Sequence, residues 1–392
     1  MSPSHVPARR LLDSSDPPQC PLPALLGEPT QVACSSLCGG QLRVDSTAAL
    51  RYFVYPPAKA DLKSGYDQLT YKQRTKTSRG LEDIFAMCLK SKNSEQLLDV
   101  QVITWAGIVK RIMLGKKMHL NVSFHNGILY IESHCPPEWY IDIGTSRVLS
   151  IRDPQTYWGY NFETLCSSET PQGPSGGTVN LQTHFSVAVV RKIGSLKLLL
   201  VGDVDCVKPE YIQNPGPEHY VELKLKTFEQ DRSRPVLKDK WEMQSLLLGG
   251  RKILVGYTNK AGVLRNVKTL SVRVSHSAWR QRRIDWAARV LHSLVEYCGQ
   301  AQQDEGVLKV WRVELGKWYA DIRELGTAEE RALNPWGGAR NGILPVYFLK
   351  GLRRKLAIPH LASAEARERA LNQWRRPRAA NPVDFLEALR PK

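Results

Sequence analysis

The sequence predicts an α+β fold with mixed, largely antiparallel sheets built from hairpins and flanked by helices. Two observations support this prediction. Pairs of apolar, strand-like runs enclose short turn sequences, as at His125-Asn126-Gly127 and Gly194-Ser195. Between the hairpins, apolar residues recur at helical spacing over residues 81–89, 236–248 and 276–300.

The pattern divides the 392 residues into three parts. Residues 1–40 are rich in Pro, Ser and Cys without sustained periodicity, and we predict a flexible tail there. Residues 41–350 are predicted to form a single domain, because strand and helix signals follow one another throughout. Residues 351–392 read as a basic, Ala-rich helical tail, for which a solvated helix, an RNA-gripping arm and a nuclear import signal are alternatives.

Within the domain the elements follow in order. A strand-like stretch at 41–54 ends at Pro56-Pro57, and an amphipathic helix covers 81–89. Alternation predicts strands at 99–105, 120–124 and 128–131, and a second hairpin at 185–193 and 196–201. A helix is expected near 158–163, after Pro154. A helix at 236–248 precedes a third hairpin, at 253–257 and 263–270, and a strand is expected at 308–313. On the long helix at 276–300, Trp279, Trp286 and Val290 share an apolar stripe, and the exposed side is expected to carry Arg280, Arg282 and Arg289.

The charge balance indicates a polyanionic partner. There are 55 Lys and Arg against 38 Asp and Glu, a net charge of +17, which favours nucleic acid or an acidic membrane surface. No apolar run reaches membrane-spanning length. Of the two polyanionic partners we expect nucleic acid and no membrane. Residues 1–10 lack the apolar core of a signal peptide, and the eight Cys are scattered. We therefore expect reduced thiols in a cytoplasmic protein, with the nucleus as the alternative.

One stretch has the composition of a metal site. Asp203 and Asp205 end an apolar strand two residues apart, and Glu222 and Lys224 repeat this spacing on the next strand. If the strands are neighbours, three carboxylates and an ammonium converge, and a divalent cation relieves the repulsion between the acids. The pattern predicts a metal-dependent phosphodiesterase in which the Lys holds or helps to deprotonate the attacking water. The ordinary alternative is a solvated strand face.

Several short segments, in this order, give the chain a family likeness. The main ones are Gly159-Tyr160-Asn161-Phe162-Glu163, Pro174-Ser175-Gly176-Gly177 with Val179-Asn180, Gly202-Asp203-Val204-Asp205-Cys206, Tyr220-Val221-Glu222-Leu223-Lys224 and Lys240-Trp241-Glu242-Met243-Gln244-Ser245; Leu50-Arg51-Tyr52 and Thr104-Trp105-Ala106-Gly107 are weaker. Together they resemble the DXO/Rai-type decapping and 5′-3′ exoribonuclease family of RNA quality-control enzymes over roughly 50–270. The residues before 41 and after 350 match little of that pattern.

The resemblance implies an active site of the restriction-nuclease type with two Mg²⁺ or Mn²⁺ ions. The implied metal ligands are Glu163, Asp203, Asp205, Glu222 and the main-chain carbonyl of Leu223. The implied catalytic residues are Lys224, Glu222 and Asp205. Candidate substrate-binding residues are Lys224, Gln244, Asp203, Arg51 and Ser186. Taken alone, Gln244 on an apolar helix stripe reads as a buried structural amide, and Glu163 as a helix-surface carboxylate.

The chain departs from the family pattern at Ala106, where an Arg usually stands between the Trp and the Gly. That Arg is expected to contact the RNA 5′ phosphates, and Lys110 or Arg111 are nearby cations that partly substitute. The likeness is therefore greatest to fungal members with the same loss. The missing Arg therefore predicts little or no release of pyrophosphate from 5′-triphosphate RNA. If Ala106 limits this reaction, Ala106→Arg restores it; if Ala106 only packs, Arg clashes.

The resemblance implies hydrolysis of NAD caps and of incomplete or unmethylated caps, followed by 5′-3′ degradation of capped or monophosphorylated RNA in mRNA quality control. NAD is then a substrate and not a cofactor. Two other interpretations remain: a DNA nuclease of the restriction or repair type, and a non-catalytic partner of a larger exoribonuclease. The intact acids and Lys224 favour an enzyme over a scaffold.

Overall fold

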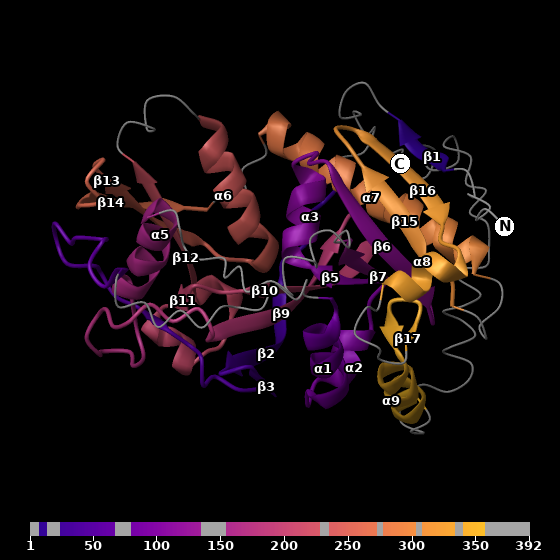
Figure 1. Cartoon of the computed structure of the whole chain (residues 1–392), viewed down its shortest axis with the longest axis horizontal. Coiled ribbons are helices and arrows are strands. Elements are labelled where there is room, and N and C mark those ends of the chain that lie inside the picture. Colours follow the sequence, from indigo (N-terminus) through magenta and orange to yellow (C-terminus); the bar gives the residue numbers. More distant parts are fainter. Residues whose placement is uncertain are drawn as a thin grey trace, which may run out of the picture. The chain divides into compact units, whose positions relative to one another are not determined.

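The computed structural model describes residues 8–13, 24–66, 80–134, 154–227, 235–272, 277–302, 308–333 and 340–356 (Figure 1). Backbone contacts divide the chain into two units, Met1–Val346 and Tyr347–Lys392. Of the second unit only residues 347–356 are described, as part of helix α9 (Val346–Leu356). The expected basic tail at 357–392 lies outside the described residues.

The larger sheet of the first unit has ten strands. Their order is β1 (Arg9–Asp13), β16 (Tyr319–Glu324), β15 (Trp311–Leu315), β6 (Met118–His125), β7 (Ile128–Ser133), β5 (Val102–Trp105), β10 (Leu196–Asp203), β9 (His184–Ile193), β2 (Thr30–Cys38) and β3 (Gln41–Val44). Only β5 pairs in parallel within this sheet, with β7 and β10. Asn126 and Gly127, with φ of 50° and 76°, form the tight turn that the Asn-Gly pair predicts between β6 and β7.

The smaller sheet has six strands, in the order β14 (Leu264–Ser271), β13 (Lys252–Thr258), β12 (Tyr220–Thr227), β11 (Cys206–Val207), β4 (Tyr52–Phe53) and β8 (Ser167–Ser168). Strands β12 and β13 run parallel, whereas β13 and β14 form the predicted antiparallel hairpin. A two-stranded ribbon pairs β17 (Arg340–Asn341) with β18 (Leu344–Pro345). The 3₁₀ turns η2 (Pro209–Ile212) and η3 (Pro217–His219) lie between β11 and β12.

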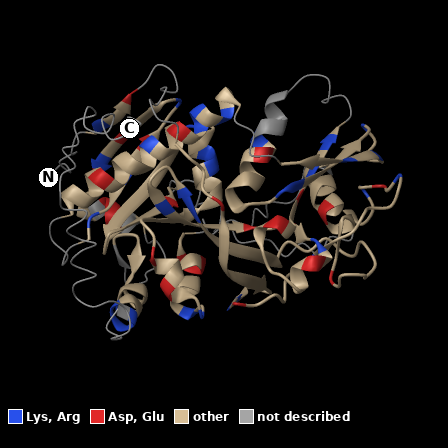
Figure 2. Cartoon of the chain, turned by 180° about the vertical axis from the view of Figure 1, so that it is seen from behind, with Lys and Arg blue, Asp and Glu red and all other residues tan. Residues whose placement is uncertain are grey.

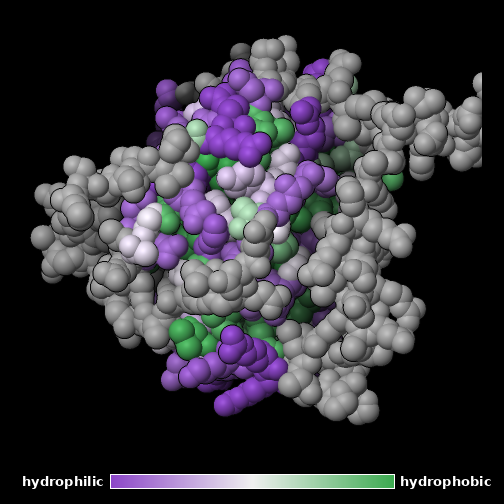
Figure 3. Space-filling model, turned by 90° about the vertical axis from the view of Figure 1, so that its right-hand side faces the viewer, coloured by the Kyte–Doolittle hydropathy of each residue, from purple (hydrophilic) through white to green (hydrophobic). Residues whose placement is uncertain are grey.

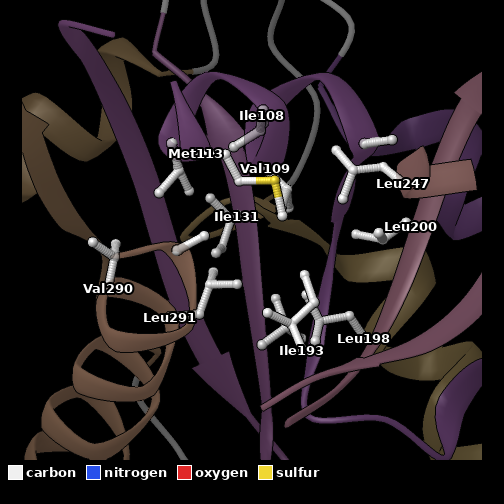
Figure 4. Close-up of a cluster of buried hydrophobic side chains, with 14 of the residues drawn as sticks. Ile108, Val109, Met113, Ile131, Ile193, Leu198, Leu200, Leu247, Val290 and Leu291 are labelled. Carbon is white, nitrogen blue, oxygen red and sulfur yellow. The ribbon is translucent and has the colours of Figure 1, made fainter. Parts of the chain in front are cut away.

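Helices cover both faces of the larger sheet. α3 (Ala106–Met113) and α7 (Ala278–Ala301) pack on one face, where Val109, Leu198 and Leu291 are fully buried (Figure 4). α1 (Glu82–Lys90) packs against β2 and β3 at one edge of the sheet, with α2 (Ser94–Leu98) beside it. The ring centroids of Phe85 of α1 and Tyr130 of β7 are 6.1 Å apart. The short helix α8 (Thr327–Ala332) follows β16. Burial of these apolar faces is what holds the layers together.

The smaller sheet lies between α5 (Pro154–Leu165) and α6 (Pro235–Leu248). Phe162 of α5 packs with Val221 and Leu223 of β12, and Leu246 of α6 packs with Ile253 of β13. A Cβ atom at Gly256 would lie 2.5 Å from the Phe162 ring, so only glycine permits this close approach of α5 to β13. β12, the strand that carries Glu222, therefore lies in a sheet that is covered by α5 on one face and by α6 on the other.

The α+β prediction is confirmed, with two corrections of detail. The tail expected at 1–40 is wrong for Arg9–Asp13 and Thr30–Cys38, which are strands of the larger sheet. Arg9–Asp13 is only five residues long and Thr30–Cys38 is rich in Ser and Cys, so the strand structure of both depends on pairing with distant strands. Arg280 is not on the exposed side of α7: it is buried and paired with Glu242 of α6. The remaining domain boundaries stay a prediction.

The described surface is mixed in charge and polarity. Lys and Arg lie on helices and strands throughout the described chain (Figure 2), and one face carries hydrophilic residues with apolar residues between them (Figure 3). In the part of the chain that is described, no helix is both long and apolar enough to cross a membrane. The six described cysteines are free thiols, as expected.

Candidate active site

The candidate acids gather where the chain passes from the larger sheet to the smaller one. Asp203 is the last residue of β10, and Asp205 precedes β11, so the two aspartates do not lie on one strand as expected. The crossover needs close packing, because a Cβ atom at Gly202 would lie 2.7 Å from Leu248 Cδ1. Asp205 Oδ2 accepts a 2.7 Å hydrogen bond from the Leu223 main-chain N–H. The crossover therefore attaches Asp205 to the strand of Glu222 and Lys224.

Glu222 is the centre of the hydrogen-bonding network. Its side chain is 10% exposed, and its Oε1 accepts hydrogen bonds from Lys224 Nζ and, at 2.6 Å, from Gln244 Nε2. Lys224 Nζ also donates to the Leu223 carbonyl at 3.0 Å. Glu222 and Lys224 share a face of β12, as their spacing predicts, and Gln244 reaches them from α6.

Burial and mutual repulsion raise the pKa of two nearby carboxyls. Burial, with the charges of Asp205 and Glu222, raises the pKa of Glu163 to about 8. Burial, with the charge of Glu222, raises the pKa of Asp205 to about 7. Burial lowers the pKa of Lys224, but Glu222 and Asp205 outweigh burial and raise it. Glu163, Asp205, Glu222 and Lys224 therefore interact electrostatically as one group, in which three carboxylates are balanced by a single ammonium.

The donor chemistry of this unit fits a divalent cation, because buried carboxylates and a main-chain carbonyl are hard oxygen ligands. The acids are not drawn together around one point, however. Among the described residues, no three His, Cys, Asp or Glu side chains are placed as a metal-binding group. Glu222 Oε1 is instead engaged by the ammonium of Lys224 and the amide of Gln244.

The two other substrate-binding candidates have partners in the protein. Ser186 Oγ donates to Asp203 Oδ1 at 2.6 Å, so its hydroxyl orients an acid of the site. Arg51 Nη1 binds Glu169 Oε1 at 2.9 Å, and its Nε donates to Ser167 Oγ at 3.4 Å. Ser167 in turn donates to the Glu163 carbonyl at 2.8 Å. Arg51 is thus linked to the end of α5 that carries Glu163.

Lys110 was considered on the sequence only as a substitute cation. Its Nζ donates to Gln244 Oε1 at 2.7 Å, whereas the exposed Arg111 donates to the Lys117 carbonyl. A Lys within an apolar helical segment was the one available signal, but no local pattern identifies a partner 134 residues away.

Ala106, where the family pattern has Arg, is the first residue of α3 and is 6% exposed. Its Cβ would lie 3.5 Å from a Cβ placed on Gly202. Ala106 therefore packs at the crossover, beside the strand end that carries Asp203.

The sequence matches the family model described as RAI1 like PD-(D/E)XK nuclease over residues 27–345. The chain belongs to this family. Its members are nucleases, so the protein is a hydrolase, and the resemblance seen in the short motifs is confirmed.

Similar proteins include fungal and mammalian members. The decapping nuclease RAI1 of Emericella nidulans is 28% identical over 269 residues, covering 62% of this chain and 71% of that protein. The human decapping and exoribonuclease protein is 24% identical over 284 residues, covering 66% and 70%.

Solved structures share the fold of this RAI1-like nuclease. Candida albicans Rai1 in complex with pU5-Mn2+ matches with a TM-score of 0.70 and 19% identity, covering 89% of this chain and all of that one. Scheffersomyces stipitis Rai1 in complex with (3'-NADP)+ and calcium ion matches with a TM-score of 0.69 and 20% identity, covering 89% and 97%.

Proposed function

We propose that this protein is a divalent-metal-dependent nuclease acting at RNA 5′ ends. It removes NAD caps and incomplete or unmethylated caps and then degrades the RNA in the 5′-3′ direction, in mRNA quality control. Relatives named decapping nuclease and decapping and exoribonuclease protein support this activity. The observation that carries the proposal is the contact of Lys224 and Gln244 with Glu222, beside Asp205 and Glu163, in a nuclease fold.

Mg²⁺ or Mn²⁺, with two ions per site, is the proposed cofactor. Glu163, Asp203, Asp205, Glu222 and the Leu223 carbonyl would hold the ions, because Asp205 is bonded to the strand of Glu222 and repels Glu163 and Glu222 until positive charge is bound. When bound, the ions supply an acidified water molecule and a positive charge for the scissile phosphate.

The protein's own donors complete the site. Lys224 and Gln244 each present an N–H group at Glu222, which places two hydrogen-bond donors beside the acids for an anionic phosphate or for the water. Glu222 and Asp205 would hold the water, and one of the two carboxylates would accept the single proton that it loses. Arg51, with Ser186 acting through Asp203, positions the RNA close to its 5′ end.

RNA is proposed as the substrate over DNA. The acids and Lys224 do not discriminate between the sugars, so the preference rests on the names of the relatives. The net charge of +17 suits a single strand bound along its phosphates. Association with a larger exoribonuclease and residence in the cytoplasm, with the nucleus as the alternative, remain part of the proposal.

The test is an assay on RNAs of one sequence that carry an NAD cap, an unmethylated guanosine cap, a triphosphate or a monophosphate, with DNA of the same sequence beside them. With Mg²⁺ or Mn²⁺ the wild-type protein should cut the capped and monophosphorylated RNAs. Glu222→Gln should reduce both activities by several orders of magnitude, since one site serves both.

Glu210→Gln is the matched control, because Glu210 is exposed and lies outside the site. It should leave the rates unchanged. An equal rate for Glu222→Gln and the wild type, or cutting of DNA in place of RNA, would overturn the proposal.

A further inference from the structure

A chain of hydrogen bonds joins three elements at the site. Lys110 of α3 donates to Gln244 Oε1 at 2.7 Å, and Gln244 of α6 donates through Nε2 to Glu222 Oε1 at 2.6 Å. Glu222 lies on β12 of the smaller sheet. Lys110 and Gln244 are 134 residues apart in the sequence, so the packing of α3 against α6 brings them into contact.

The chemistry of the amide gives Lys110 a specific effect. An ammonium group only donates hydrogen bonds, so the end of the Gln244 amide that faces Lys110 is its oxygen. The NH₂ end then faces Glu222, as the 2.6 Å contact requires. Without Lys110 the amide oxygen loses its donor, and only the bond to Glu222 still restrains the amide. The Gln244 side chain can then move out of the position in which its NH₂ group faces both Glu222 and the reacting phosphate or water.

The packing of α3 holds Lys110 in this position. Ile108, Val109 and Met113 are buried in the core beneath the helix (Figure 4). The partly buried Lys110 contacts α6, whereas the adjacent Arg111 is exposed. Burial lowers the pKa of Lys110, although the charge of Glu222 opposes this effect. The ammonium is therefore held in poorly solvated surroundings, where its bond to Gln244 is strong.

We propose that Lys110 is a positioning residue that fixes the orientation of the Gln244 amide, so that its NH₂ group faces Glu222 and the reacting phosphate or water. Its effect on the reaction rests on the proposed nuclease function. Lys110 acts through Gln244 and does not touch the substrate.

The test is a double-mutant cycle on the full-length protein with 5′-monophosphate RNA. Lys110→Met should lower kcat about 10- to 100-fold, the range for losing one charge-assisted hydrogen bond, with a much smaller change in KM. Gln244→Ala should cause a loss of at least that size, and Lys110→Met/Gln244→Ala should lose no more than Gln244→Ala alone. Lys110→Arg, which keeps a cationic donor, should recover part of the rate.

Lys116→Met is the matched control, because Lys116 is an exposed cation just after α3 that has no contact with Gln244, and the variant should leave kcat unchanged. Additive losses of Lys110→Met and Gln244→Ala, or a rise in KM alone, would overturn the proposal. Urea unfolding of the wild type, Lys110→Met, Gln244→Ala and the double variant measures the coupling of the two side chains independently of nuclease activity. An inactive wild-type protein would refute the nuclease function, and zero coupling in unfolding would refute the positioning role.

Discussion

Arg280 and Glu242 form a buried ion pair that joins α7 to α6. The two side chains are only 4% and 7% exposed, and the Arg280 guanidinium donates directly to Glu242 Oε2. Glu242 lies two residues before Gln244, so the pair anchors the helix that brings Gln244 to Glu222. A charge at position 280 therefore supports the site from within the fold and does not serve as a surface contact for RNA.

We predict that Arg280→Ala lowers the free energy of unfolding by about 3–5 kcal/mol, because it leaves Glu242 buried without its cation. Urea denaturation measures the change. Arg280→Met combined with Glu242→Leu should recover most of the loss, because no buried charge remains. Arg282→Ala is the control and should change stability by roughly 0.5 kcal/mol or less. A stable Arg280→Ala protein with weakened RNA binding would instead restore the exposed role expected from the sequence.

Ala106→Arg tests the departure from the family pattern. Ala106 is buried beside the crossover at Gly202, so we expect Arg to overpack this position and to cost on the order of 1–3 kcal/mol. Pyrophosphate release from 5′-triphosphate RNA should not rise. Gly107→Arg places the same side chain one residue further on, at an exposed position with open space, and should be tolerated. A stable Ala106→Arg protein with faster pyrophosphate release would show that Ala106 limits that reaction.

Ser186 and Asp203 provide a test of orientation. Ser186→Ala removes the 2.6 Å hydrogen bond to Asp203, and we predict a decrease in kcat of about tenfold or less, since Asp203 is exposed and retains water as a partner. Steady-state kinetics on 5′-monophosphate RNA measures it. Ser186→Thr keeps the hydroxyl and should retain more activity. An increase in KM with unchanged kcat would mean that Ser186 binds substrate directly.

Glu132 should make stability depend on pH. Burial raises the pKa of this β7 carboxyl to about 7, although Asn121 and Arg312 oppose the shift. The folded protein therefore binds a proton that the unfolded chain releases near its ordinary pKa. Stability is greatest below that ordinary value and falls as pH rises through about 7, by at most about 3 kcal/mol.

Glu132→Gln, which stays neutral, should show a smaller fall than the wild type when urea denaturation is compared at pH 5 and pH 8, because only the part of the fall due to Glu163 and Asp205 remains. Glu296→Gln, at a position whose side chain is 61% exposed, should behave as the wild type does. Equal pH dependence of Glu132→Gln and the wild type would contradict the prediction.

Local patterns in the sequence were enough for several features. Backbone preferences determine the turn at Asn126-Gly127. The two-residue period of a strand determines the apolar hairpin strands and places Glu222 and Lys224 on one face of β12. Trp286 and Val290 were predicted as core for the same kind of reason, since helical spacing places them on one face. Such features are decided within a few residues of the chain.

The tertiary structure alone decided how these parts meet. The chain changes sheets between Asp203 and Asp205, and long-range packing at Gly202 permits this although the D-x-D spacing predicts one strand. Arg280 is buried because α6 supplies Glu242, and Lys110 reaches the site because α3 lies against the same helix. Each of these contacts joins residues far apart in sequence, and the packing of whole elements brings them together in a way that no local pattern specifies.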